Sequence, residues 1–255
     1  MTFRTLQKWH GAGNDFLVEV IEHGTEVWWN AERARAVCQR TTGVGADGLV
    51  LASLGTHVAM ELYNADGTVA EMSGNGIRCL AAAVRRATRA SWSSLELHTA
   101  AGLRTVTLAM DDDSGTGSVS MGRVSFGDTL EGTLGIAYVG NPHVVVRDSA
   151  QWSISDREDV ARSWSDQLNG ANVEFVTVVS PDRVNLRVFE RGVGWTLACG
   201  TGSCASVAVL AISQEVGHDV VVANPGGELR VRLEGNEVTL SGPVQFVANV
   251  EWNSD

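Results

Sequence analysis

Two short stretches of this chain resemble each other: Ser73-Gly74-Asn75-Gly76 and Cys199-Gly200-Thr201-Gly202. Each opens a segment rich in small residues, and their first residues lie 126 positions apart, from 73 to 199. Asn64 lies nine residues before Ser73, and Glu190 lies nine residues before Cys199. Solenoid repeats run ~20–50 residues, so a repeat of this length indicates two related halves that each place one reactive side chain at a helix start.

Strand-like and helix-like segments alternate in both halves. Helices are expected near 31–40, from Gly74, near 156–168 and from Gly200 to 212, and the last two strands at 238–240 and 244–250. The acidic stretch 111–117 has no large apolar residue, and it is the best candidate for a boundary between the halves. The prediction is an α/β (α+β) fold with two pseudo-symmetric domains, each a curved, mostly antiparallel sheet around one helix.

Composition excludes several classes of protein. The chain has 255 residues and a net charge of −11, which argues against nucleic acid or an anionic membrane as a partner. It has no apolar run of ~18 residues and no apolar core of a signal peptide, so we expect a cytoplasmic enzyme. The four cysteines form no CxxC pair, so reduced thiols are expected instead of disulfides or a metal site.

Cys199 is the strongest candidate for chemistry. A helix N-terminus carries unpaired N–H groups and partial positive charge, which bind a carboxylate or phosphate. The same field lowers the pKa of a thiol, so Cys199 is expected to act as a thiolate base. The alternative is a buried, inert cysteine beside a tight turn. The repeat at Ser73 favours the functional interpretation.

Two glycine patterns resemble a dinucleotide-binding motif without its context. The stretch 43–48 fits GxGxxG, but it follows a helix and precedes a strand, which is the wrong order. The stretch 200–205 fits GxGxxA, but only 50 residues follow it, too few for the remaining strands and helices. Binding of NAD is therefore not expected.

Several polar residues accompany the two stretches. His143 lies in the repeat of 14–16 and is a candidate base partner, although a lone histidine is more often structural. Glu190-Arg191 is either a solvated ion pair or a carboxylate near the thiol beside a guanidinium that binds a substrate carboxylate. Four asparagines in small-residue loops complete the candidates: Asn14, Asn64, Asn141 and Asn172.

In combination these motifs resemble diaminopimelate epimerase over nearly the whole chain. The matching stretches are His10–Phe16, Thr42–Gly48, Asn64–Gly67, Ser73–Cys79, Gly140–His143, Asn172-Val173, Glu190–Gly192, Ala198–Gly202 and Asn224–Gly227.

The resemblance implies a cofactor-independent and metal-free epimerase that interconverts LL- and meso-diaminopimelate, usually as a homodimer. It implies halves at 1–117 with about 244–255 and at 118–243, with the active site in the cleft between them. Family members use two cysteines, one on each face of the α-carbon, assisted here by His143 and Glu190. The remaining residues would bind substrate: Asn14, Asn64, Gly74, Asn75, Asn141, Asn172, Glu190, Arg191, Gly200 and Thr201.

One position departs from the family. Ser73 stands where the family has its first catalytic cysteine, and a hydroxyl is a far weaker acid than a thiol. The chain is either a Cys→Ser variant of an epimerase or a natural Ser/Cys enzyme with another amino acid as substrate, acting as racemase, epimerase or dehydratase. A non-catalytic amino-acid-binding protein is the alternative from another class.

Overall fold

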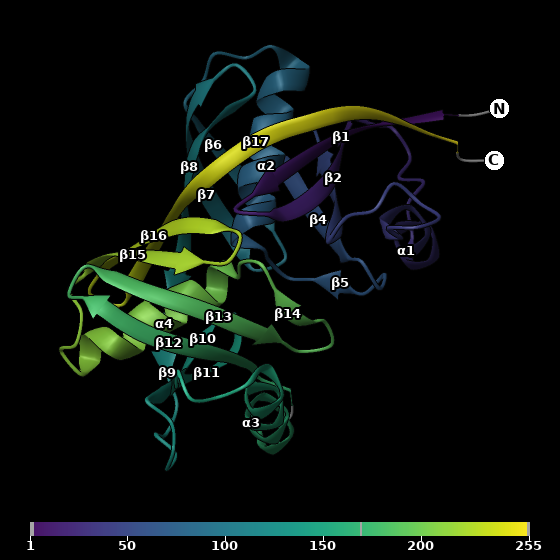
Figure 1. The fold of residues 1–255 in the computed structure, drawn as a ribbon. Coiled ribbons are helices and arrows are strands. Elements are labelled where there is room, and N and C mark those ends of the chain that lie inside the picture. The colour runs from purple at the N-terminus through teal and green to yellow at the C-terminus, as the bar shows by residue number, and fades with distance from the viewer. Residues whose placement is uncertain (1–2, 169, 254–255) are drawn as a thin grey trace. The chain divides into compact units, whose positions relative to one another are not determined.

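The computed structural model describes residues 3–168 and 170–253, and these divide into two compact units. Unit 1 takes the described residues of Met1–Val119 and Gly242–Asp255, and unit 2 takes those of Ser120–Ser241. Figure 1 follows the chain from its purple to its yellow end.

The predicted α+β class is confirmed, since strands dominate both units and two helices accompany each set of strands. The first half contains β1 (Phe3–Gly11), β2 (Asn14–Ile21), α1 (Ala31–Cys38), β3 (Gly48–Ser53), β4 (Val58–Asn64), β5 (Val69–Ala70), α2 (Gly74–Thr88), β6 (Ser94–Thr99), β7 (Gly102–Asp111) and β8 (Ser114–Arg123). The second contains β9 (Ser125–Phe126), β10 (Gly135–Val139), β11 (Asn141–Arg147), α3 (Ile154–Gln167), β12 (Asn172–Ser180), β13 (Arg183–Glu190), β14 (Gly194–Thr196), α4 (Gly200–Ile212), β15 (Asp219–Asn224), β16 (Gly227–Glu234) and β17 (Glu237–Asn253).

The two units repeat one order of strand pairing. In unit 1, β1 and β2 are antiparallel, α1 connects β2 to parallel β3, β3 and β4 are antiparallel, and α2 connects β4 to parallel β6. In unit 2, β10 to β13 and β15 follow the same sequence of pairings, with α3 and α4 as the connections. The repeat seen in the sequence is therefore a repeat of topology.

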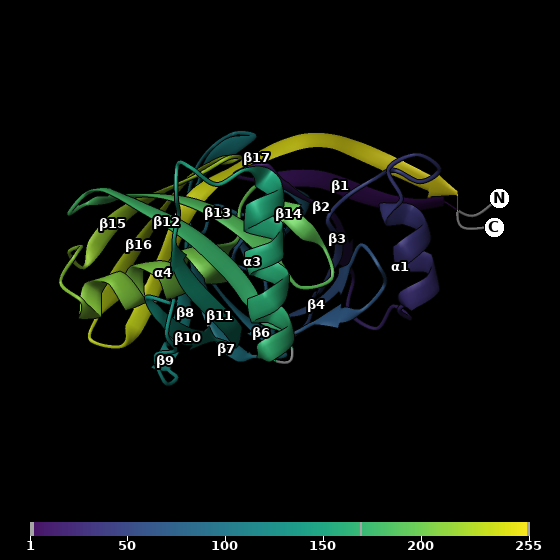
Figure 2. The same ribbon diagram turned by 60° about the horizontal axis from the view of Figure 1, so that its bottom comes forward.

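Each unit buries both faces of its central strands. Successive side chains of a strand point to opposite faces, so Leu17 and Leu49 pack under α1 while their neighbours Val18 and Val50 are also fully buried. In unit 2, α3 packs on β12 (Figure 2), and α4 packs against β10, β11 and β16. The glycine- and alanine-rich helices α2 and α4 are buried along most of their length, which only small side chains allow.

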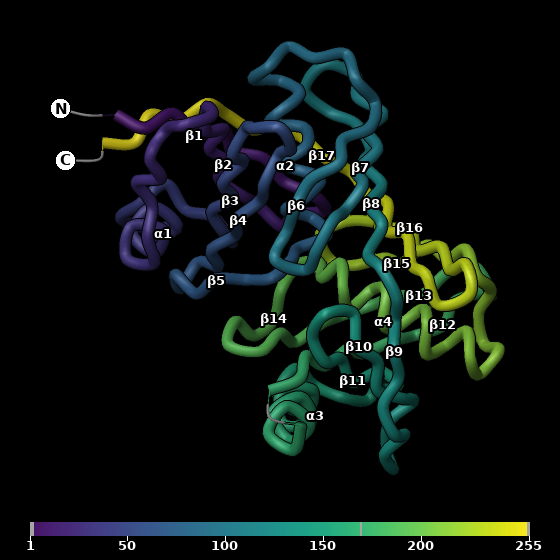
Figure 3. Tube along the Cα trace, turned by 180° about the vertical axis from the view of Figure 1, so that it is seen from behind, coloured from purple at the N-terminus to yellow at the C-terminus, as the bar shows by residue number. Residues whose placement is uncertain are grey.

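One sequence expectation about segments is corrected. The acidic stretch 111–117, the candidate boundary, belongs to the hairpin between β7 and β8, in which Asp111 pairs with Ser114, and unit 1 passes into unit 2 just after it, at Val119 and Ser120. The strands expected at 238–240 and 244–250 are one strand, β17, which pairs with β16 up to Ser241 and with β1 from Gln245. Pro243 has no N–H to donate, and it lies in the gap between these two pairings. β1 and β17 run side by side in Figures 1 and 3.

Two buried thiols make unit 1 sensitive to alkali. Burial raises the pKa of Cys38 and of Cys79 from 9.0 to about 12 in each case. As the pH rises from about 9 towards 12, the unfolded chain loses these protons and the folded chain keeps them. We therefore expect the free energy of unfolding to fall by about 1.4 kcal/mol per pH unit for each thiol, and to be unaffected by them below about pH 8.

Urea unfolding between about pH 8 and about pH 10 measures this loss. The matched control is Cys38→Ala with Cys79→Ala, in which that part of the slope disappears. An identical slope in the parent and the double variant would show that other groups cause the alkaline loss.

Candidate functional site

The predicted residues of unit 1 gather at one edge of its sheet. Parallel β2 and β3 begin at this edge, with Asn14 as the first residue of β2. Antiparallel β4 ends there, with Asn64 paired to Gly48. The chain then leads through β5 to Ser73, which caps α2. The direction of the strands thus explains why residues far apart in the sequence lie together.

Ser73 is the N-cap of α2. Its backbone is extended, at φ −139° and ψ 122°, and its Oγ accepts a hydrogen bond of 3.0 Å from the N–H of Gly76. A Cβ on Gly76 would lie 3.3 Å from the ring of Phe16 and 3.3 Å from Ser73 Oγ, so the helix start packs tightly on β2. The first turn offers the N–H groups of Gly74 and Asn75, which suit an anion.

Unit 2 builds the same arrangement around Cys199. Asn141 begins β11, Asn172 begins the parallel strand β12, and Glu190 ends antiparallel β13. Cys199 caps α4 with φ −122° and ψ 118°, and its Sγ accepts from the N–H of Gly202 at 3.4 Å. The two reactive positions are therefore equivalent N-caps of equivalent helices.

The electrostatics of Cys199 correct the sequence expectation. Burial, then the carboxylates of Glu190 and Glu174, raise the pKa of this thiol well above its ordinary 9.0. The hydrogen bonds with Thr201 and with the N–H of Gly202 act in the opposite direction and are outweighed. Cys199 is thus a protonated thiol near neutral pH in the ligand-free protein.

His143 is held between two oxygens in the interior of unit 2. Its Nδ1 lies 2.7 Å from Oε1 of Glu174, and its Nε2 lies 2.9 Å from Oδ1 of Asn141. The side chains of His143 and Glu174 are both 0% exposed. Burial raises the pKa of Glu174, and the charge and hydrogen bond of His143 oppose this rise. The contacts of both ring nitrogens fix the orientation of the His143 ring.

The end of β13 is ordered by two further contacts. Thr196 donates its hydroxyl to Oε1 of Glu190 at 2.5 Å, and the backbone N–H of Arg191 donates to Oδ1 of Asn172 at 2.9 Å. The Arg191 side chain is exposed. In unit 1, Asn14 accepts a hydrogen bond from Asn75 at 3.1 Å, whereas Asn64 donates to Thr68 within its own loop.

Sequence reasoning missed Glu174, and the repeat contains the signal that identifies it. His143 pairs with Asn172 in unit 2 as Phe16 pairs with Gly48 in unit 1, so Glu174 occupies the place of a buried valine, Val50. A Cβ on Gly202 would come within 2.6 Å of the Glu174 carboxylate, which places this charge against the first turn of α4. A buried carboxylate at a strand position where the other half has valine is a candidate for a functional residue. Thr196 and Asp47 were also missed, because a single polar residue at the end of a short strand or in a loop carries no such signal.

Removing the charge of Glu190 tests the electrostatic description of Cys199. In Glu190→Gln one of the two carboxylates that raise the pKa of the thiol is absent, so the thiolate fraction at a given pH increases. We expect alkylation of Cys199 by iodoacetamide at about pH 8 to become several-fold faster, as followed by mass spectrometry of the modified peptide. Cys199→Ser gives the background from Cys38, Cys79 and Cys204, which are buried. Slower or unchanged alkylation would contradict the assigned cause.

Neither a membrane span nor a metal cluster is found in the described part of the chain. No helix there combines the length and apolarity needed to cross a bilayer. No three His, Cys, Asp or Glu side chains among the same residues are grouped so that they could hold a metal ion.

Comparison with known proteins connects this geometry to one family. The family model described as diaminopimelate epimerase matches residues 6–127 and 135–247. A diaminopimelate epimerase of Xanthomonas axonopodis pv. citri is 36% identical over 275 residues, which cover 96% of this chain and 95% of the relative. One from Synechocystis sp. is 32% identical over 272 residues, covering 95% and 96%.

Solved structures share the fold at low identity. A predicted epimerase from Pseudomonas aeruginosa has a TM-score of 0.78 at 15% identity, over 99% of this chain and 100% of that one. A hydroxyproline epimerase from Agrobacterium vitis has a TM-score of 0.74 at 16% identity, over 99% and 91%. These two similarities concern the fold alone.

Proposed function

The chain belongs to the diaminopimelate epimerase family, and we propose that it acts on LL- and meso-diaminopimelate by proton transfer at the α-carbon without a cofactor. The observation that carries the proposal is the pair of equivalent N-caps, Ser73 on α2 and Cys199 on α4. Inversion at one carbon needs one group that removes a proton and another that supplies a proton on the opposite face. A duplicated half-site supplies two such positions.

We propose roles for the residues of unit 2 from their contacts. Cys199, a protonated thiol at rest, supplies a proton to the α-carbon of one isomer. For the other isomer it first loses its own proton and then removes the α-proton as the thiolate, and Glu190 and His143 assist the two catalytic positions. Asn141, Asn172 and the Arg191 guanidinium bind substrate, because Arg191 is exposed and its planar fork suits a carboxylate. The N–H groups of Gly200 and Thr201 stabilise the negative charge that develops on the substrate α-carboxylate when the α-proton is removed.

In unit 1, we assign Asn14, Asn64, Gly74 and Asn75 to substrate binding and Ser73 to the second catalytic position. A serine hydroxyl does not form a ready alkoxide near neutral pH, so this half of the two-base reaction is impaired. The proposal thus predicts a chain that binds diaminopimelate and inverts it slowly.

The proposal carries further consequences for the protein as a whole. Both half-sites act on one substrate molecule. Residues 1–117 plus about 244–255 form one domain, and residues 118–243 form the other. The family resemblance further suggests a homodimer in the cytoplasm and a place in lysine biosynthesis.

Exchange of the substrate α-proton in D2O, followed by NMR, tests the proposed function. LL- and meso-diaminopimelate are incubated separately with the protein, and deuterium incorporation and isomer ratio are both recorded. We expect exchange of the isomer whose α-proton reaches Cys199, with little inversion. Full epimerisation would contradict the impairment at Ser73. Binding of both isomers with no exchange would favour the non-catalytic binding protein, and no binding of either would favour another amino acid as substrate.

A further inference from the structure

We propose that Asp47 is a positioning residue that fixes the side-chain amide of Asn14 in the orientation used to bind substrate. The proposal rests on the proposed function, in which Asn14 binds diaminopimelate. Asp47 lies in the loop directly before β3, and Asn14 begins the neighbouring strand β2.

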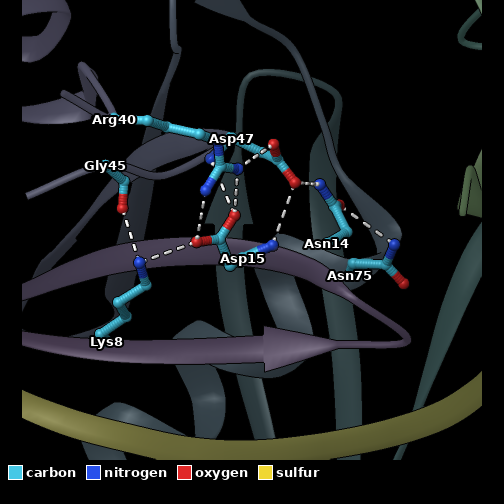
Figure 4. Close-up of polar contacts among 7 residues, drawn as sticks. All are labelled: Lys8, Asn14, Asp15, Arg40, Gly45, Asp47 and Asn75. Atoms are coloured by element: carbon cyan, nitrogen blue, oxygen red, sulfur yellow. Dashed lines mark hydrogen bonds and ion pairs between the residues drawn. The ribbon is translucent and has the colours of Figure 1, made fainter. Parts of the chain in front are cut away.

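The carboxylate of Asp47 contacts Asn14 directly (Figure 4). Its Oδ2 accepts from Nδ2 of Asn14 at 2.7 Å and from the backbone N–H of Asp15 at 3.1 Å. Its Oδ1 accepts from Arg40 Nη2 at 2.7 Å. Both carboxylate oxygens are thus occupied by donors, which holds the carboxylate plane in place.

The orientation of the Asn14 amide follows from the chemistry at both ends of a hydrogen-bonded chain. At one end, the buried Arg78 guanidinium donates to Oδ1 of Asn75 at 2.6 Å. Nδ2 of Asn75 then donates to Oδ1 of Asn14 at 3.1 Å, and Nδ2 of Asn14 donates to Asp47. A guanidinium only donates and an ionised carboxylate only accepts, so both amides must point the same way.

This direction decides what Asn14 offers a ligand. With one N–H donated to Asp47 and one lone pair of Oδ1 used by Asn75, one N–H and one lone pair remain. Rotating the amide by half a turn would face the Asn75 NH2 with another NH2 and the Asp47 carboxylate with a carbonyl oxygen. Both contacts would then be repulsive, so Asp47 excludes the second orientation.

A group of charges holds Asp47 in turn. Arg40 bridges Asp47 and Asp15, and Lys8 Nζ lies 2.9 Å from Oδ2 of Asp15 while donating to the carbonyl of Gly45 at 2.7 Å (Figure 4). Burial raises the pKa of Asp15, but the hydrogen bonds and charges of Arg40 and Lys8 outweigh it and lower that pKa overall.

Stability alone does not account for this arrangement. The side chains of Arg40 and Asp47 are 59% and 41% exposed, and ion pairs this exposed contribute little to folding. Changing Asp47 should therefore affect ligand binding more than it affects unfolding.

The first test is a double-mutant cycle on binding of LL-diaminopimelate, measured by calorimetry with the whole chain. Asp47→Asn keeps the shape of the side chain and allows Asn14 to turn. We expect about tenfold weaker binding in Asp47→Asn, and no further loss when Asp47→Asn is added to Asn14→Ala. The matched control, Asp113→Asn, breaks the ion pair of Asp113 with Arg86 in the same unit and should bind as the parent does.

Additive losses in the cycle would overturn the positioning role, because an indirect structural effect does not depend on the Asn14 amide. Binding in Asp47→Asn equal to that of the parent would overturn it as well.

The second test needs no ligand and separates this proposal from the proposed function. In protein labelled with 15N-asparagine, the two side-chain protons of Asn14 should be strongly inequivalent, with the proton bonded to Asp47 shifted downfield. This separation should decrease to that of an ordinary asparagine side chain in Asp47→Asn and stay as in the parent in Asp113→Asn. An unchanged Asn14 signal in Asp47→Asn would overturn the positioning role. If the parent chain binds no diaminopimelate, the proposed function fails, and the amide signal still decides whether Asp47 orients Asn14.

Discussion

Ser73→Cys is expected to raise the rate of diaminopimelate epimerisation by about 10²–10⁴-fold, the range typical of a positioned general acid or base. The change replaces a hydroxyl that barely ionises by a thiol that does. A thiol fits at the N-cap of α2, because Cys199 occupies the equivalent N-cap of α4 with its Sγ 3.4 Å from the N–H of Gly202. Conversion of the LL to the meso isomer, separated by chiral chromatography, measures the rate.

Ser163→Cys is the matched control for that change, since it adds a thiol on the exposed surface of α3. It should leave the rate at the level of the parent. If Ser73→Cys turns over no faster than the parent, Ser73 is not the limiting group, and the Ser/Cys enzyme with another substrate becomes the better description.

Ser73→Cys should also lower the free energy of unfolding. Serine is among the preferred N-cap residues, and its Oγ satisfies the N–H of Gly76 at 3.0 Å. Sulfur is a weaker acceptor, so Ser73→Cys is expected to reduce the free energy of unfolding by up to about 1 kcal/mol in urea. The serine therefore favours the fold at the position where the proposed chemistry favours a thiol.

Cys199→Ala is expected to reduce exchange of the substrate α-proton by at least about 10³-fold, the second large effect. With Ser73 at the other N-cap, Cys199 is the one thiol at either reactive position, and its removal leaves no group there that exchanges a proton readily. Binding of diaminopimelate should change only a few-fold, because the proposed binding contacts come from other residues. Deuterium incorporation and calorimetry on the same samples separate the two effects.

Cys204→Ala is the control for losing a buried thiol from α4, and it should exchange the α-proton at the rate of the parent. Exchange in Cys199→Ala at the rate of the parent would mean that another group moves the proton. Glu190 and Glu174, the two carboxylates whose charges act on Cys199, would be the next candidates.

The repeat in the sequence was sufficient to predict the two helix starts at which the reactive side chains lie. The helices at Gly74 and Gly200 begin where expected, because glycine after an N-cap residue followed by small apolar residues suits a buried helix. The repeat could not reveal that β17 is continuous through Pro243, since that depends on which strands lie on either side. The protonation of Cys199 was also out of reach. A helix N-terminus predicts a lower pKa, whereas burial and two carboxylates from distant strands raise it.

The long strand β17 also determines the order in which the chain is completed during synthesis. Phe3 of β1 pairs with Asn253. The described strands of unit 2 pair with one another, and the last residue in these pairings is Ser241. β1 therefore lacks its neighbour from β17 until after the strands of unit 2 have been synthesised. Folding of domains usually proceeds from the N-terminus during translation. Here the edge of β1 stays unpaired until residues 245–253 have been synthesised, and an unpaired strand edge is a template for pairing with another chain.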